Sequence, residues 1–297
     1  MIAAGPFHMC QPTLINDWCA PTATAVGAHH LRVFSERDGA RPNILPRLST
    51  AVASHYEAPE RLAARMARVG FEKAAQLLRS LLPQTPTARS ADLGEILATE
   101  AVPELLHPFH IPIKRLRWKD AREMAMRGED LIGVAREGAN VRFLKGESKS
   151  GMAVAPNVIA KAREALNRNG GRPSEHAMTF VMQRLWEIGE DELAVVFEHY
   201  LMERTIAPVQ LTHLCFVLCG NDTSAALTAD LQTCGGPVEQ QSIALRIADH
   251  QEFIAAVFEE VSARARRGFA FVRPGADRRR VAAARSGARA PADCSSL

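Results

Sequence analysis

The chain has 297 residues, of which 47% are hydrophobic and 23% are charged, and its formal net charge is +3 at pH 7. Its apolar runs fall far short of the roughly 20 residues that cross a bilayer, which excludes a membrane-spanning protein. We therefore expect a globular protein that has no membrane partner. The six cysteines are scattered, and no basic start with an apolar core precedes them, so we expect a reducing, cytoplasmic compartment.

The first 87 residues predict two regions. Residues 1–56 contain repeated prolines that break any long periodicity, so we expect an irregular N-terminal segment with little regular structure before about Leu48. Residues 57–87 predict a helical accessory region and a linker, because apolar side chains recur at near-helical spacing from Glu57 to Leu82. Pro83 ends this pattern and opens a Pro/Thr-rich linker.

Residues 88–235 predict an α/β core. Helical patterns are expected over four ranges: 90–105, 156–167, 173–188 and 191–202. Strand patterns are expected over four others: 110–118, 130–136, 140–148 and 211–218. A short helix is expected to follow the first of these strands up to Arg127. The second and third strands are separated by Glu137, Gly138 and Ala139, which is typical of a hairpin.

The carboxyl end predicts a helix over 236–263 and then a basic tail over 264–297. The tail is rich in Ala, Arg and Gly and has few large apolar residues, so we expect it to be disordered. Cys215 and Cys219 have the spacing of a metal-binding pair, but they lie in an apolar run with no second pair nearby. A buried strand is the favoured interpretation there.

The hairpin places three chemically useful side chains together. Asp130 stands at the start of one predicted strand, and Glu147 and Lys149 stand near the end of its partner. Glu147 and Lys149 are two residues apart, so their side chains share one face of the strand. Two carboxylates on one face repel unless a cation lies between them, and hard oxygen ligands with open positions suit Mg²⁺ or Mn²⁺. Glu95, one residue from the apolar stripe of its predicted helix, is a further candidate ligand facing a cleft beside the core.

Lys149 is informative because lysine is rare in this chain. Only six of the 36 basic residues are lysines, so arginine is the default cation. A lysine can help to position or deprotonate a water and stabilise a phosphate, whereas arginine cannot lose its proton in a protein. A Glu-x-Lys triplet is weak by itself, and a solvated charge pair at a strand end is the plainer alternative. Asp130, the hairpin and Glu95 together favour a catalytic site.

These residues resemble the pattern of the PD-(D/E)xK nuclease superfamily, with Asp130 matching its aspartate, Glu147 and Lys149 its E-x-K, and Glu95 its helix glutamate. A closer resemblance is to the nuclease subunit of the Hachiman anti-phage defence system. Three short blocks carry it, and the similarity covers roughly residues 60–235: 93–97 (LGEIL), 128–133 (GEDLIG) and 144–149 (LKGESK).

The resemblance implies a restriction-endonuclease-like mixed sheet flanked by helices. It also implies a metal-dependent DNA endonuclease that uses Mg²⁺ or Mn²⁺ at Asp130, Glu147 and Glu95. Such an effector works with a separate helicase that restrains it. The chain has no G-x-x-x-x-G-K-[ST] loop, so ATP hydrolysis is expected to belong to that partner.

The basic residues near the predicted site are candidates for DNA binding. Lys114, Arg115 and Lys161 are the residues that we expect to contact DNA phosphates. The same basic residues leave an alternative open, in which the chain is a catalytically inactive nucleic-acid-binding or scaffold subunit with the same fold. Metal binding through Asp130 and Glu147 distinguishes the two hypotheses.

Overall fold

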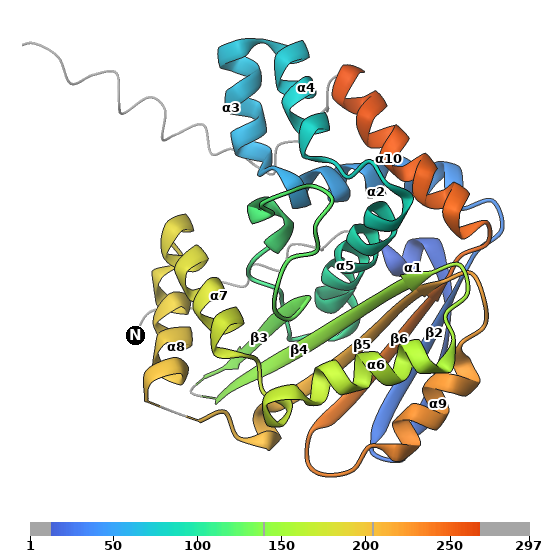
Figure 1. Ribbon diagram of the computed structural model, residues 1–297, viewed down its shortest axis with the longest axis vertical. Helices are drawn as coiled ribbons and strands as arrows, with labels where there is room; N and C mark the ends of the chain where they lie inside the picture. Colours follow the sequence, from blue (N-terminus) through green and yellow to red (C-terminus); the bar gives the residue numbers. More distant parts are fainter. Residues whose placement is uncertain (1–12, 139, 204, 268–297) are drawn as a thin grey trace, which may run out of the picture.

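The computed structural model describes residues 13–138, 140–203 and 205–267, and within them a mixed sheet carries helices on both faces (Figure 1). Its strands are β1 Cys19–Val26, β2 His29–Glu36, β3 Leu131–Glu137, β4 Asn140–Gly151, β5 Leu211–Cys219 and β6 Glu239–Arg246. They lie in the order β1-β2-β6-β5-β4-β3. The edge strands β1 and β3 are antiparallel to their neighbours, and the four inner strands are parallel. The predicted α/β class with a mixed, helix-flanked sheet is confirmed.

The helices cover the sheet in separate groups. They are α1 Ile15–Trp18, α2 Arg41–Tyr56, α3 Pro59–Val69, α4 Phe71–Leu81, α5 Pro86–Leu105, α6 Pro156–Asn167, α7 Glu175–Ile188, α8 Asp191–Met202, α9 Ser224–Thr233 and α10 His250–Arg267. Helices α2, α4, α5 and α10 pack together over one face, and α6 and α9 cover the other. Helices α7 and α8 pair beside β3 (Figure 1). Among the described residues, none of these helices is both long and apolar enough to span a membrane.

Strand β5 shows how the two faces are filled. All of its residues are buried, and successive side chains point to opposite faces. Leu214 and Phe216 pack in the cluster that contains α5, whereas Cys215 and Val217 pack with α6 and α9. Cys215 and Cys219 are buried free thiols, and burial raises the pKa of Cys215 to about 12. The buried-strand interpretation of this run is therefore confirmed.

Most of the predicted elements between residues 57 and 219 are confirmed. The near-helical pattern of 57–82 forms α3 and α4, which are separated at Gly70. The hairpin forms as β3 and β4, with Glu137 paired to Asn140. Ala139, part of the predicted turn, lies outside the described residues. The patterns at 90–105, 156–167, 173–188, 191–202 and 211–218 form α5, α6, α7, α8 and β5.

The expectation of an irregular segment up to residue 56 is wrong for residues 15–56, which form α1, β1, β2 and α2; residues 1–12 lie outside the described part. Strand β1 lacks an apolar alternation because it is an edge strand with six of its eight residues exposed. Pro21 is tolerated on that edge, and Pro42 lies in the first turn of α2, where no backbone donor is needed. Strand β2 is fixed by pairing with the distant β6.

Three other expectations are corrected. Residues 110–118 form no named strand, because Pro112 lacks a donor and only His110 bridges to Val134 of β3. Residues 119–127 form bends and turns instead of a helix, since most of their side chains are exposed and no apolar face is buried. Residues 236–263 contain β6 before α10, so they are not one helix. Helix α10 takes in residues 264–267, and the rest of the predicted tail, 268–297, lies outside the described residues.

Gly94 lets α5 approach β4 closely. A Cβ atom added at Gly94 would lie 2.9 Å from Ser148 Oγ and 3.1 Å from Ser150 Cβ, although the residue is in the middle of a helix. Glycine costs helix stability at such a position, so its presence is explained by the close packing of helix and strand. This contact sets the position of Glu95, the next residue along α5.

We expect Gly94→Ala to lower the free energy of unfolding by about 1 kcal/mol, because overpacking of about 1–3 kcal/mol outweighs the gain of up to about 1 kcal/mol in helix propensity. Urea unfolding followed by circular dichroism measures this change. Gly235→Ala is the matched control, since nothing lies within 4 Å of an added Cβ there. A Gly94→Ala protein more stable than the wild type would contradict the packing argument.

Candidate active site on the β3-β4 hairpin

The hairpin brings Asp130 next to Glu147, as the sequence predicts. Leu131 pairs with Gly146, so the antiparallel register carries Asp130 to the position opposite Glu147. Asp130 Oδ2 accepts a hydrogen bond of 2.8 Å from the backbone N–H of Ser148. This bond fixes the carboxylate against β4 although Asp130 lies just before the first residue of β3.

Glu147 and Lys149 share one face of β4, and the Lys149 ammonium donates to Glu147 Oε1. They pair with Cys215 and Val217 of β5, whose side chains belong to the cluster beneath α6. Both side chains are only partly buried, with 15% of Glu147 and 28% of Lys149 exposed. The predicted common face is therefore confirmed, and both charged groups remain accessible to water.

Glu95 approaches Asp130 from α5, on the opposite face of the sheet. Its Oε2 atom is buried and has no hydrogen-bond partner among the described residues. The nearest cation is Arg115, whose Nε lies 3.8 Å away. Burial, together with the negative charge of Asp130, raises the pKa of Glu95 to about 8 despite Arg115. A cation close to Glu95 would therefore stabilise its ionised form.

Asp130 is electrostatically linked to both other carboxylates. Burial and the charge of Glu147 raise its pKa to about 6, against the lowering effects of the Ser148 N–H, Arg115 and Lys149. Its own charge raises the pKa of Glu95. Asp130 therefore stands between two like charges, one on each side of the sheet.

The donor chemistry of these carboxylates fits a hard divalent cation. Within the described residues, however, no group of three or more His, Cys, Asp or Glu side chains is already positioned to hold a metal ion. Mg²⁺ commonly binds through one or two carboxylates and completes its shell with waters and substrate phosphates. Asp130, with Glu147 or Glu95, meets that requirement, and the unsatisfied Glu95 oxygen agrees with it.

The residues predicted to bind DNA are placed differently from one another. Lys114 lies 2.6 Å from Glu100 and donates to Ser54, so its charge is used within the fold. Arg115 donates to the backbone carbonyls of Glu129 and Arg127, which holds the segment before β3. Lys161 is exposed on α6. Lys161 alone of the three presents an accessible ammonium without an ion pair among the described residues.

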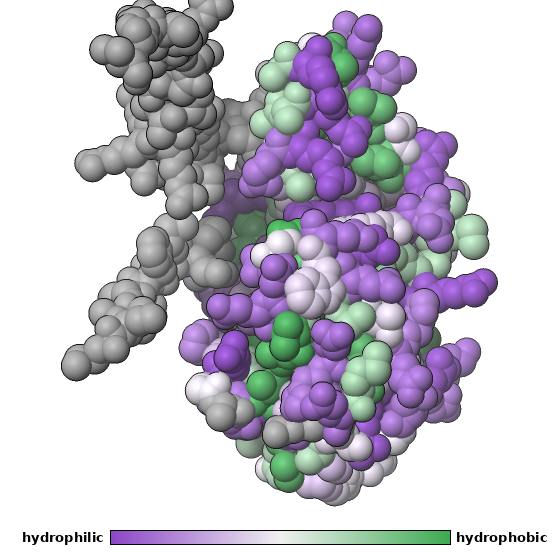
Figure 2. Space-filling model, turned by 90° about the vertical axis from the view of Figure 1, so that its left-hand side faces the viewer, coloured by the Kyte–Doolittle hydropathy of each residue, from purple (hydrophilic) through white to green (hydrophobic). Residues whose placement is uncertain are grey.

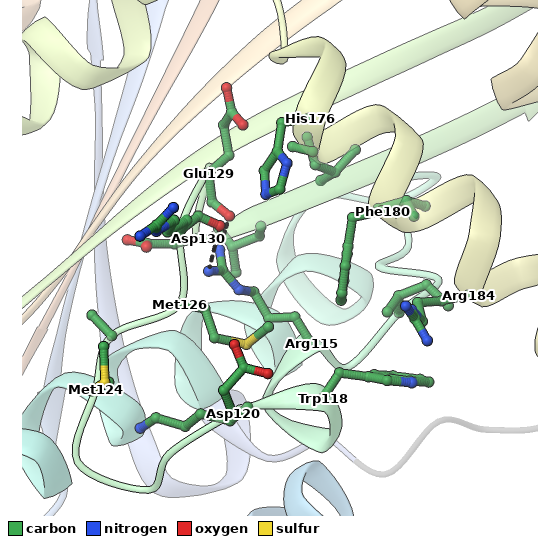
Figure 3. Close-up of a pocket in the computed structure, with 18 of the residues that line it drawn as sticks. Arg115, Trp118, Asp120, Met124, Met126, Glu129, Asp130, His176, Phe180 and Arg184 are labelled. Carbon is green, nitrogen blue, oxygen red and sulfur yellow. Dashed lines mark hydrogen bonds between the residues drawn. The ribbon is translucent and has the colours of Figure 1, made fainter.

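A cleft of about 660 Å³ opens beside Asp130 (Figure 3). Asp130 and Arg115 line it, together with Trp118, His176 and Phe180. The side chains of Glu95, Glu147 and Lys149 are not part of its lining. Glu95 does not line this cleft, because α5 packs closely on β4 and leaves 12% of the Glu95 side chain exposed.

Lys145 and Glu129 were not predicted as part of the site. Lys145 is 1% exposed and donates to the carbonyls of Arg168 and Arg172, each at 3.0 Å, and its Nζ lies 3.6 Å from Glu129. Glu129 also accepts from the backbone N–H and hydroxyl of Ser174, at 2.8 and 2.7 Å. The sequence offers one signal: Lys145 is two residues before Glu147, so both side chains are on the same face of the predicted strand. Lysine is almost never fully buried, so its burial could not be expected from that spacing.

Comparisons with known proteins give one family. The HamA family model matches residues 12–261, which is most of the chain and includes every candidate site residue named above. No curated protein matches the chain.

We expect Glu95→Gln to raise the free energy of unfolding at pH 8.5 in EDTA, because it removes a buried charge that Asp130 repels. The folded-state pKa of Glu95 lies above its ordinary 4.5, so stability is lost as pH rises through about 8. The gain should be small at pH 5 and on the order of 2 kcal/mol at pH 8.5, since one pKa unit is worth about 1.4 kcal/mol and the buried amide has its own cost.

Urea unfolding at the two pH values measures this difference. Glu164→Gln, on the exposed side of α6, is the matched control and should change little at either pH. A Glu95→Gln protein that is no more stable than the wild type at pH 8.5 would show that Glu95 is not electrostatically stressed.

Proposed function

Because the chain belongs to the HamA family of the Hachiman anti-phage defence system, we propose that it is the nuclease of such a system: a divalent-metal-dependent endodeoxyribonuclease that nicks or degrades DNA. The observation that carries this proposal is that Asp130 lies across the hairpin from Glu147, whose ion-pair partner is Lys149, and is electrostatically linked to Glu95. Burial and mutual repulsion raise the pKa of Glu95 and of Asp130. Stressed carboxylates of this kind are typical of functional sites.

The same side chains support membership of the PD-(D/E)xK superfamily. Mg²⁺ or Mn²⁺ bound by such carboxylates neutralises charge on a phosphate and supplies a more acidic water. Asp130, held by the Ser148 N–H, and Glu147 would hold the ion, and Glu95 would orient its water shell. Lys149, kept beside Glu147 by their ion pair, would position the attacking water and donate to the phosphate.

We also propose that a helicase-like subunit binds and restrains this chain. Two helical regions expose large apolar side chains: Val69, Leu77 and Leu81 on α3 and α4, and Val195 and Met202 on α8. Figure 2 shows apolar side chains among hydrophilic ones on the side that includes α7 and α8. Such side chains commonly pack against a partner.

A second candidate is a nucleic-acid-binding or scaffold subunit without catalysis. The observation that favours it is that no three-ligand metal group is preformed among the described residues. Lys161 and neighbouring arginines would bind phosphate in either case. A plasmid nicking assay with and without Mg²⁺ or Mn²⁺ separates the two candidates, since a scaffold gives no metal-dependent nicks.

We predict that Asp130→Asn and Glu147→Ala each reduce metal-dependent plasmid nicking by more than about a hundredfold, the upper end of the losses seen for outer-shell changes at metal sites. Both variants should remain folded, because each removes a charge from a repelling set. Glu95→Gln should cost less, about tenfold, as an outer-shell change. Glu137→Ala, an exposed acid at the far end of β3, is the control and should keep wild-type activity. Wild-type nicking by either principal variant would mean that the site is wrongly assigned.

Lys149→Arg separates charge from chemistry. It keeps the positive charge, but guanidinium is larger and planar and does not release its proton, so we expect nicking to fall by about a hundredfold or more. Single-turnover rates in Mg²⁺ measure the chemical step. The exposed Lys73→Arg on α4 is the matched control. If Lys149→Arg kept the full rate, Lys149 would only bind phosphate or be a surface charge, and would not act on the attacking water.

A further inference from the structure

The cleft beside Asp130 has two walls of different origin. One face of α7 forms the first wall through His176, Phe180 and Arg184, which are spaced four residues apart and so share one side of the helix. The segment before β3 forms the second wall, to which Trp118 contributes. In Figure 3, Phe180 and Trp118 project from these two walls, and Asp130 lies near Glu129 and Arg115.

The aromatic rings are held in a fixed arrangement. Trp118 and Phe180 meet edge to face, with their centroids 6.1 Å apart and their planes at 90°. The Arg184 guanidinium lies 5.6 Å from the Trp118 centroid and 5.4 Å from that of Phe180, and Arg184 is also paired with Glu187. Trp118 and Phe180 are both partly exposed although they pack on a buried cluster. Rings fixed in this way and open to a cleft can stack on a flat ligand with little loss of entropy.

We propose that this cleft binds an unpaired nucleobase, so that the substrate of the site is a single-stranded stretch of DNA whose backbone passes Asp130. The inference deepens the proposed nuclease function and rests on it for the role of Asp130. The cleft volume of about 660 Å³ lies in the range of sites for small ligands, roughly 300–1,000 Å³. A base within a duplex has both faces covered by its neighbours and cannot use the aromatic rings without leaving the stack.

Arginine side chains give this cleft groups that can contact DNA phosphates. Arg115, Arg127 and Arg184 line it together with the acids Asp120, Glu129 and Asp130. Arg127 is exposed, and its side chain makes no ion pair among the described residues, so it is available to a phosphate. Met124 and Met126, on the segment before β3, also line it and supply adaptable apolar contact for a base of any identity. A binding mode that combines stacking with arginine contacts is tolerant of sequence.

The test measures binding without cleavage. The full chain in EDTA is titrated into a short single-stranded oligonucleotide carrying a central 2-aminopurine, and separately into a blunt duplex of the same sequence. We expect quenching of 2-aminopurine by the wild-type protein and about tenfold weaker single-strand binding by Phe180→Ala and Trp118→Ala, with duplex binding unchanged. Phe180→Tyr should restore binding, which separates stacking from loss of fold.

Trp186→Ala is the matched control, because Trp186 is on α7 and 43% exposed but does not line the cleft. Single-strand affinity that is absent, is unaffected by Phe180→Ala and Trp118→Ala, or falls equally with Trp186→Ala would overturn the proposal and indicate packing or a protein contact. If the protein binds single strands through the aromatic residues but never nicks DNA, the nuclease proposal is overturned and the base-binding cleft is supported. If the protein nicks DNA with metal but binding does not depend on the aromatic residues, the base-binding cleft is overturned and the nuclease proposal is supported.

Discussion

Repulsion among buried carboxylates is the constraint on which the candidate site depends. Asp130 is placed between Glu147 across the hairpin and Glu95 from α5; the charge of Glu147 raises the pKa of Asp130, and the charge of Asp130 raises the pKa of Glu95. A fold gains nothing in stability from burying Glu95 beside Asp130, because the Glu95 carboxylate loses hydration without a hydrogen-bonded cation. Arg115 is 3.8 Å from Glu95, too long for a hydrogen bond, and does not offset the penalty. Strain of this kind is kept where a function requires it.

The part of the site that could be predicted is the part encoded locally. Two β-like apolar runs on either side of Gly138 predict the hairpin, and its register brings Asp130 to Glu147. The two-residue spacing of Glu147 and Lys149 fixes their common face. Helix α5 was equally predictable, but how deeply Glu95 is enclosed depends on Gly94 meeting Ser148 of a distant strand, which no local pattern contains.

The missed elements share a different physical cause. Strands β1 and β2 owe their form to pairing with each other and with β6, more than 200 residues further along the chain. Strand β6 begins with polar residues because Gln240 and Gln241 are buried through hydrogen bonds with Arg163 and Arg32. Periodicity detects burial by apolar side chains, so polar residues satisfied by long-range partners escape it. The opposite error at 119–127 arose because helix-forming residues there find no apolar surface to bury.

Lys145 connects the hairpin that carries Asp130 to the helix α7 that forms one wall of the cleft. Its buried ammonium lies near Glu129, the residue before Asp130, and donates to two carbonyls in the connection between α6 and α7. Glu129 accepts from Ser174, and the Ser174 hydroxyl in turn accepts from the backbone N–H of Ala177 as the N-cap of α7. A chain of bonds thus runs from β4, through the residue beside Asp130, to the first turn of the helix that forms one wall of the cleft. The wall cannot shift relative to Asp130 without breaking charge-assisted hydrogen bonds in a poorly hydrated region, which are stronger than their surface equivalents. These bonds tie the first turn of α7 to the residue before Asp130, so a ligand held against α7 is held in register with the hairpin.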